Sequence, residues 1–127
     1  MGTVYVLTGS GPPDATTPSS VAVSATTTYY TNPIGNSGNG ACSFHSVFTG
    51  TPTGAVTLWY TDKPNADRTT DTDWVQDTTF VAVDPAGAAT KSFHTVGNLA
   101  TRSARLKYVN ASGTGTWVVW ATVSTGV

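Results

Sequence analysis

The sequence lacks most of the residues that favour α-helices. It contains no Glu, so that its seven acidic residues are all Asp, and Leu, Met and Gln are scarce. These are the strong helix formers. Threonine is the commonest residue, with 25 copies, and it occurs with valines, aromatic residues and glycine-rich breaks. Because β-branched and aromatic residues favour strands, we predict an all-β protein.

Charge is also scarce. Six basic and seven acidic residues give a net charge of −1, which provides no long-range attraction to nucleic acid. The one basic group near an aromatic residue is Arg102, Arg105 and Lys107 beside Tyr108. We interpret this group as a solvated strand face. We therefore expect no nucleic-acid partner.

Cysteine is nearly absent. Cys42 is the single copy, so that no internal disulfide can form. Residues 1–8 have neither a basic start nor a long apolar run, so we expect no secretion signal and no membrane partner. A chain of 127 residues has the size of one domain and can bury an ordinary core.

The apolar residues alternate with polar ones in short runs separated by turn residues, which predicts strands. Seven or eight such strands fit an antiparallel β-sandwich or jelly roll. Residues 9–20 contain three prolines and two glycines, so we divide the chain into an N-terminal arm and linker (1–20) and a β-sandwich domain (21–127). The expected strands are 3–8, 21–30, 41–49, 56–61, 73–83, 90–96, 103–110 and 116–124.

Two of these strands are informative about their faces. In 103–110, alternation places Leu106 and Tyr108 inward and Arg105 and Lys107 toward water. In 116–124 both faces are apolar. Such a strand is either covered on both sides within the fold or lies at a subunit interface.

No set of residues predicts catalysis, a cofactor site or a metal site. His45 and His94 lack an evident third ligand, and Cys42 on a strand points away from His45, so that it is a core residue. An aspartate-rich loop could offer oxygen ligands to Ca²⁺ but lacks the spacing of an EF-hand, which favours a solvated loop. Its acids are Asp62, Asp67, Asp71, Asp73 and Asp77.

Three elements occur in a fixed order. Gly50-Thr51-Pro52-Thr53-Gly54 precedes Val56-Thr57-Leu58, a polar loop closes with Asp73-Trp74-Val75, and Ala104–Tyr108 is followed by Ser112-Gly113-Thr114-Gly115-Thr116. This order resembles small β-sandwich virion proteins of tailed bacteriophages, over about residues 41–124. The resemblance implies a structural component of the particle and no catalysis.

From these features we expect a capsid decoration or head-associated protein on the exterior of the virion, assembled in the host cytoplasm. It would dock as a homo-oligomer, with a trimer favoured, onto the major capsid protein or other virion proteins. The arm would add a strand to a neighbour. The expected interface residues are Val4, Val6, Trp117 and Trp120.

The alternative is a tail or fibre-tip adhesin that binds host glycans. Trp59 and Trp74 would stack on sugar faces, while Asp71 and Asp73 would hold hydroxyl groups or a Ca²⁺ ion. An enzyme would require a metal that joins His45 and His94. We expect no cofactor.

Overall fold

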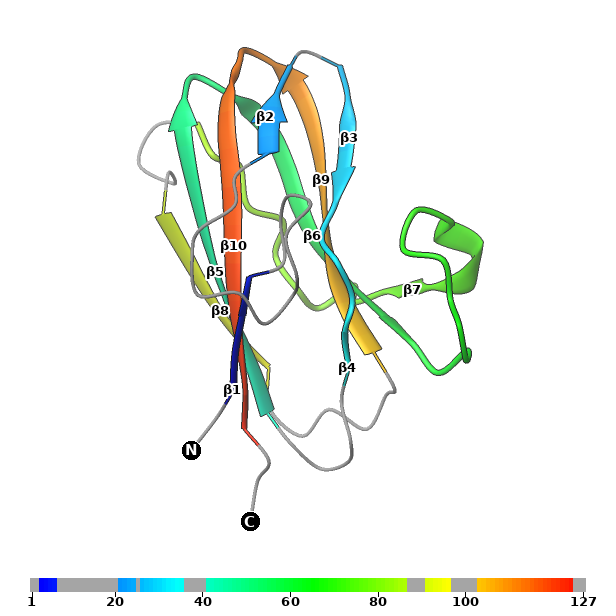
Figure 1. The fold of residues 1–127 in the computed structure, drawn as a ribbon. Helices are drawn as coiled ribbons and strands as arrows, with labels where there is room; N and C mark the ends of the chain where they lie inside the picture. The colour runs from blue at the N-terminus through cyan, green and yellow to red at the C-terminus, as the bar shows by residue number, and fades with distance from the viewer. Residues whose placement is uncertain are drawn as a thin grey trace.

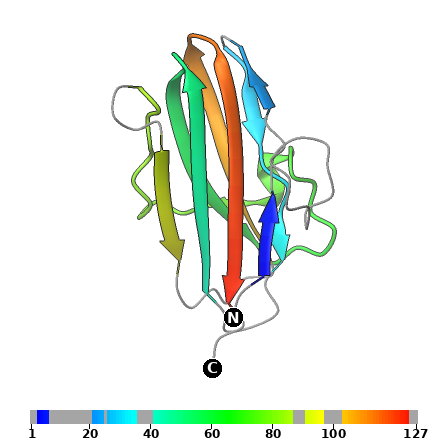
Figure 2. The ribbon, with the colours of Figure 1, turned by 60° about the vertical axis from the view of Figure 1, so that its left-hand side comes forward.

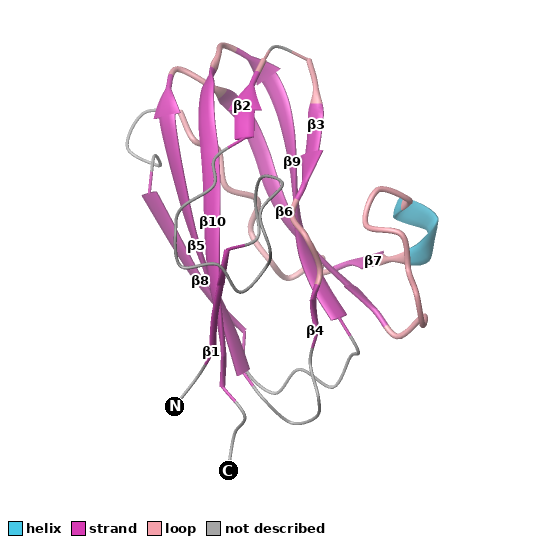
Figure 3. Ribbon diagram, in the orientation of Figure 1, coloured by secondary structure: helices cyan, strands magenta, loops and turns pink. Residues whose placement is uncertain are grey.

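The chain forms an antiparallel β-sandwich, as the composition and alternation predict (Figures 1 and 3). The structure is a computed structural model, and it describes residues 3–6, 21–24, 26–35, 41–86, 91–96 and 103–124. Two five-stranded sheets pack against each other. None of the described segments is a helix with the length and apolar character needed to cross a membrane.

We name each sheet after its long C-terminal strand. The β10 sheet has the order β1-β10-β5-β8, with β2 also paired to β10, and the β9 sheet has the order β3-β9-β6-β7, with β4 also paired to β9. The β10 sheet contains β1 (Thr3–Val6), β2 (Val21–Val23), β5 (Ala41–Gly50), β8 (Lys91–Val96) and β10 (Gly115–Ser124). The β9 sheet contains β3 (Thr28–Tyr30), β4 (Ile34–Gly35), β6 (Thr53–Thr61), β7 (Val75–Gln76) and β9 (Ser103–Ser112).

Two turns join the sheets at the same end of the sandwich (Figure 1). One connects β5 to β6 and the other connects β9 to β10, and the backbone N–H of Thr51 donates to the carbonyl of Thr114 at 2.9 Å. Gly50 and Gly113 both have φ +81°, a conformation that glycine adopts without strain. The Gly50–Gly54 and Ser112–Thr116 motifs, far apart in sequence, are therefore two halves of one connection.

The core lies between the sheets and is rich in aromatic residues. Phe48 stacks on Trp117 with ring centroids 5.9 Å apart, and Tyr108 meets Phe48 edge-on at 4.9 Å. Such pairs contribute about 0.5–1.5 kcal/mol each beyond the burial of their area. Leu106 and Tyr108 are fully buried, which confirms their predicted inward orientation. The other large buried residues are Phe44, Val56, Leu58 and Val119.

Of the predicted strand 73–83, only β7 (Val75–Gln76) is present. Asp71–Asp73 forms one turn of 3-10 helix, β7 is two residues long, and a turn follows at Asp77, whose carboxylate accepts from the backbone N–H and hydroxyl of Thr79. These local side-chain bonds compete with the ladder bonds of a strand. The described residues form ten strands instead of seven or eight. The expected single strand 21–30 is wrong, because it divides into β2 and β3, which lie in different sheets, and the short strand β4 is added.

The N-terminal strand is not held away from the body, contrary to the prediction. β1 pairs antiparallel with β10 of the same chain, from Thr3 opposite Val123 to Val6 opposite Trp120. Backbone pairing at the edge of the β10 sheet satisfies polar groups that a detached strand would leave to solvent. The predicted linker at 9–20 lies outside the described residues.

Candidate functional site

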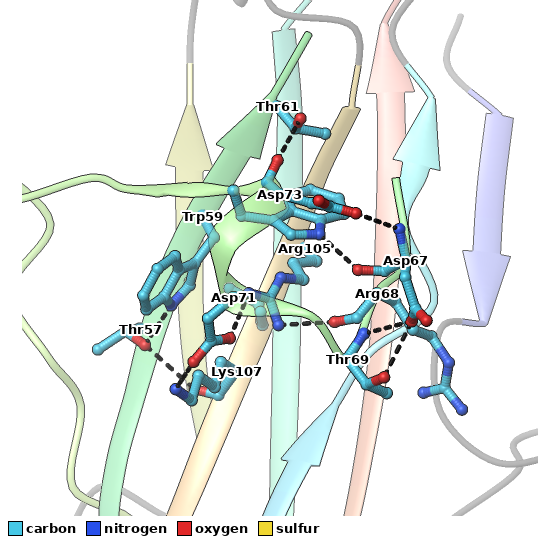
Figure 4. A network of polar contacts seen from close by, with 12 residues as sticks. Thr57, Trp59, Thr61, Asp67, Arg68, Thr69, Asp71, Asp73, Arg105 and Lys107 are labelled. Carbon is cyan, nitrogen blue, oxygen red and sulfur yellow. Dashed lines mark hydrogen bonds and ion pairs between the residues drawn. The ribbon is translucent and has the colours of Figure 1, made fainter. Parts of the chain in front are cut away.

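The outer face of the β9 sheet carries a buried arginine beneath the loop 62–74, which projects from the sandwich (Figures 1 and 4). Arg105 on β9 is 0% exposed, so the prediction that it points to water is wrong. Alternation does place it on the outer face, but the loop covers that face. We name Tyr30, Trp59, Asp71, Trp74, Arg105 and Lys107 the Arg105 cluster.

The guanidinium of Arg105 is held by two hydrogen bonds and three aromatic rings. Its Nη2 donates to Asp71 Oδ1 and its Nη1 donates to the carbonyl of Arg68, both at 2.7 Å. The ring centroids of Tyr30, Trp74 and Trp59 lie 4.6, 4.8 and 5.1 Å from its Cζ. Aromatic faces attract a cation electrostatically, most strongly when it is desolvated. The three rings therefore recover part of the solvation free energy that the guanidinium loses when it is buried.

Asp71 links the loop to β9 through two cations. It accepts from Arg105 with one carboxylate oxygen and from Lys107 with the other. Burial disfavours its charged form, but the hydrogen bonds from Arg105 and Lys107 outweigh that effect and hold the pKa of this carboxyl below its usual value. Asp71 is therefore charged at neutral pH and already engaged.

Several other polar groups of the loop are engaged with each other or with the neighbouring strands (Figure 4). Asp73 accepts from Lys63 Nζ at 2.6 Å and from the backbone N–H of Asp67 at 3.1 Å. Trp74 Nε1 donates to the carbonyl of Asp67 at 2.8 Å, and the hydroxyl of Thr61 donates to the carbonyl of Asp73 at 2.6 Å. This pattern indicates a loop that is supported by its own contacts. It is attached to β9 through Arg105 and Lys107 and to β3 through Arg68, whose Nη1 donates to the carbonyl of Tyr30 at 2.8 Å.

The four residues of the predicted ligand loop do come together here. Trp59 and Trp74 flank Arg105. Asp71 and Asp73 are the first and last residues of one 3-10 turn. Trp74 is only 5% exposed, so its ring face is turned to Arg105 and not to a sugar. Internal contacts thus account for the positions of these residues.

Metal and nucleophile chemistry find no support among the described residues. No three metal-binding side chains within them cluster. His45 is the register partner of Phe93, while His94 pairs with Phe44, so the two histidines are not opposite each other. Cys42 is buried, and desolvation raises the pKa of its thiol to about 11. At neutral pH this thiol stays protonated and is a poor nucleophile.

A second surface is the outer face of the β10 sheet, where β1, β10, β5 and β8 lie side by side (Figure 2). Trp120 is half-buried there, with its ring 5.6 Å from that of His45. Val118 and Val47 are register partners on the same face. This surface combines an aromatic residue with valines and hydroxyl side chains.

The four predicted interface residues do not all belong to the outer face of the β10 sheet. Trp117 is fully buried between Phe48 and Tyr108, so it is a core residue and not an interface residue. The interface prediction fails for Trp117 because alternation gives Trp117 and Trp120 opposite faces, and the face of Trp117 is the one that packs in the core. Val6 is the register partner of Trp120 and Val4 of Thr122, which brings these positions next to the outer face of β10.

Sequence reasoning missed the role of Arg105. The available signal was that Trp59, Arg105 and Lys107 all fall on the outward phase of their strands. The sequence did not show that they are close together, because this depends on the pairing of β6 with β9, in which Trp59 is the register partner of Arg105.

The chain was compared with known proteins. No protein-family model matches it, and no curated protein matches it.

Proposed function

We propose that this protein is a non-enzymatic structural component of a tailed-bacteriophage virion, a capsid decoration or head-associated protein that docks on the particle as a homo-oligomer. The observation that carries the proposal is the character of the outer face of the β10 sheet. Its described side chains on β5 and β10 are Ser43, His45, Val47, Thr49, Thr116, Val118, Trp120 and Thr122.

None of these eight described side chains on the two central strands carries a fixed charge, whereas the outer face of the β9 sheet holds Arg105, Lys107 and Asp71. On the neighbouring strand β8, Lys91 is the register partner of Val47. The uncharged strip formed by β5 and β10 can meet the same strip of a second copy without like-charge repulsion. Trp120 at its centre supplies the kind of aromatic anchor that dominates many interfaces. We assign this face to contacts between copies on the particle.

The resemblance to virion proteins supports the same function through its motifs. The Gly50–Gly54 and Ser112–Thr116 segments contact each other where the two turns meet, through the backbone of Thr51 and Thr114. They also contact each other within the β9 sheet, through the hydroxyls of Thr53 and Ser112 at 2.6 Å. These motifs act as scaffold, consistent with a protein whose task is to hold a surface in place. The adhesin alternative has no comparable support, because Trp74 is buried in the Arg105 cluster.

The test locates the protein in purified particles and then disturbs one face at a time. Mass spectrometry of purified virions should detect it at a copy number set by the capsid lattice, and cryo-electron microscopy should place its density on the exterior. Its absence from particles while it accumulates in the infected cell would overturn the proposal.

A matched pair of variants tests the docking face. Val118→Asp puts a charge on the outer face of β10, and Val109→Asp puts the same charge on the outer face of β9, where Val109 is 43% exposed. We expect Val118→Asp to prevent incorporation and Val109→Asp to leave it unchanged, while circular dichroism shows both folded. Equal incorporation of the two would show that this face is not the docking face.

A further inference from the structure

One edge of strand β6 is covered by an irregular segment of the same chain. On its other side β6 pairs with β9 from Thr53 to Thr61. On the covered side β7 pairs with β6 at Trp59 and Tyr60. The rest of this edge is met by residues 77–84, which we name the β6 strap.

The β6 strap is bonded to the backbone of β6 at two points. Val83 exchanges both backbone hydrogen bonds with Val56, at 2.8 and 3.1 Å, and the N–H of Asp77 donates to the carbonyl of Leu58 at 2.8 Å. Six residue steps of the strap, from 77 to 83, therefore lie opposite two steps of β6, from 56 to 58. A regular antiparallel ladder pairs residues one to one, so the strap must bow away from β6 between its two attachments.

The middle of the strap departs from the sheet. Thr78, Thr79, Val81 and Ala82 are exposed, and Val81 is 83% exposed. Phe80 is half-buried and packs against the core. The strap therefore closes this side of the sandwich without offering a regular strand edge of its own. Natural β-proteins protect the edges of their sheets in this way, with bulges and covering loops.

Two aspartates fasten the strap to both ends of β6. Asp77 Oδ2 accepts from the hydroxyl of Tyr60 at 3.0 Å, and Asp84 Oδ1 accepts from the backbone N–H of Gly54 at 3.2 Å. Gly54 is the second residue of β6 and Tyr60 the last but one. Each carboxylate also accepts from a backbone N–H two residues further along the chain, so it fixes the local turn as well.

The covered strand has the composition of a segment that pairs with copies of itself. β6, with the sequence TGAVTLWYT, contains no charged residue and no proline, and most of its residues favour strands. Such segments are prone to pair with identical segments when their edge is open. Two copies of β6 can meet antiparallel about a two-fold axis, where each gives and receives the same hydrogen bonds.

We propose that the β6 strap is an edge guard, which prevents β6 from pairing with β6 of a second copy of this chain. The inference goes beyond the proposed function, because it concerns the edge of the β9 sheet and not the outer face of the β10 sheet. The guard depends on the carboxylates of Asp77 and Asp84 and on the backbone pair of Val83 with Val56.

The experiment detaches the strap and measures association. The clamp variant combines Asp77→Ala with Asp84→Ala. The matched control combines Thr78→Ala with Val81→Ala, two exposed positions of the same strap. Sedimentation equilibrium gives the mass of each variant and of wild type over a range of concentrations, in high salt that screens the change in net charge. Circular dichroism reports whether each is folded, and NMR follows hydrogen exchange at the N–H of Val56.

We expect the clamp variant to reach double the mass of wild type and the control to keep the mass of wild type. The N–H of Val56 should exchange more slowly as the concentration of the clamp variant rises, because β6 of a second copy replaces Val83 as its partner. A folded clamp variant with the mass of wild type would overturn the proposal. Association that leaves exchange at Val56 independent of concentration would also overturn it.

A second variant decides the question if the clamp variant does not fold. Val83→Pro removes the N–H that donates to the carbonyl of Val56 and leaves both aspartates in place. The same doubling of mass is expected for it, with the same slower exchange at Val56. A folded Val83→Pro variant with the mass of wild type would overturn the proposal.

Discussion

Gly113 shows how closely the two sheets approach at their shared turns. Its φ is +81°, and a Cβ at this position would lie 2.0 Å from the carbonyl oxygen of Thr51. The side chain would meet backbone that cannot move without separating the turns. The same holds for Gly50, where the nearest atom is the carbonyl oxygen of Thr114 at 2.3 Å.

We therefore predict that Gly113→Ala lowers the free energy of unfolding by about 3 kcal/mol, from the strained backbone and the clash together. Thr114→Ala is the matched control, since Thr114 is exposed in the same turn and its replacement should change stability by less than about 0.5 kcal/mol. Urea denaturation followed by tryptophan fluorescence measures both. Equal stability of the two variants would contradict this account of the turn.

At the residue scale, alternation predicted the inward residues well and the environment of the outward ones poorly. Leu106 and Tyr108 are buried as expected, because the core requires one face of every strand to be apolar. Arg105 could not be placed, since its burial depends on a loop more than 30 residues earlier in the chain. Long-range cover of this kind leaves no periodic signal.

At the scale of the element, the loop 62–74 covers a fully buried cation, Arg105, that holds it by two hydrogen bonds. Arg105→Ala removes the hydrogen bonds to Asp71 and Arg68 and leaves a cavity between three rings. We predict a loss of about 3 kcal/mol in the free energy of unfolding, typical of the truncation of a large, fully buried side chain.

Lys63→Ala is the control for this prediction. It breaks the ion pair with Asp73, but the Lys63 side chain is 57% exposed, so the cost should be about 0–1 kcal/mol. Thermal unfolding by differential scanning calorimetry measures both variants. A larger effect for Lys63→Ala than for Arg105→Ala would contradict the anchoring role of Arg105.

The attachment of this loop also depends on pH. The pKa of Asp71 is lowered in the folded protein: burial raises it, and the hydrogen bonds from Arg105 and Lys107 lower it by more. A carboxyl with a lowered folded pKa contributes stability above its unfolded pKa, near about 3.9, and loses that contribution as pH falls through the folded pKa.

Wild type should therefore be more stable than Asp71→Asn at pH 7, and the difference in Tm should shrink as pH falls below about 4. Thr72→Ala, at an exposed neighbouring position that does not titrate, should differ from wild type by the same amount at every pH. Melting curves between neutral and acidic pH give the result. A constant difference for Asp71→Asn would show that its ionisation does not stabilise the fold.

The long strands were predictable and the short ones were not. β5, β9 and β10 each have ten residues, and their expected ranges overlap the observed ones. β4 and β7 are two residues long and exist because the neighbouring strands β9 and β6 offer free backbone groups. Such edge pairing is decided by tertiary structure, so local sequence does not show it.

At the scale of the whole molecule, composition was sufficient for the architecture but not for the pairing. A chain without Glu and rich in Thr and Val has few options other than strands. The sequence did not show which strands are neighbours in a sheet, because β5 pairs with β10 about 70 residues later in the chain. The same limit applies to β1, whose linker is visible in the sequence while its partner strand is not.

The position of β10 has a consequence for synthesis of the protein. It is the last described strand in chain order, yet it lies inside its sheet, between β5 and the pair β1 and β2. A growing chain on the ribosome cannot complete this sheet until residue 124 has emerged, and until then the edges of earlier strands are open to aggregation. Prematurely terminated chains lack Trp117 and the centre of the sheet, so they should be degraded instead of competing with the complete protein.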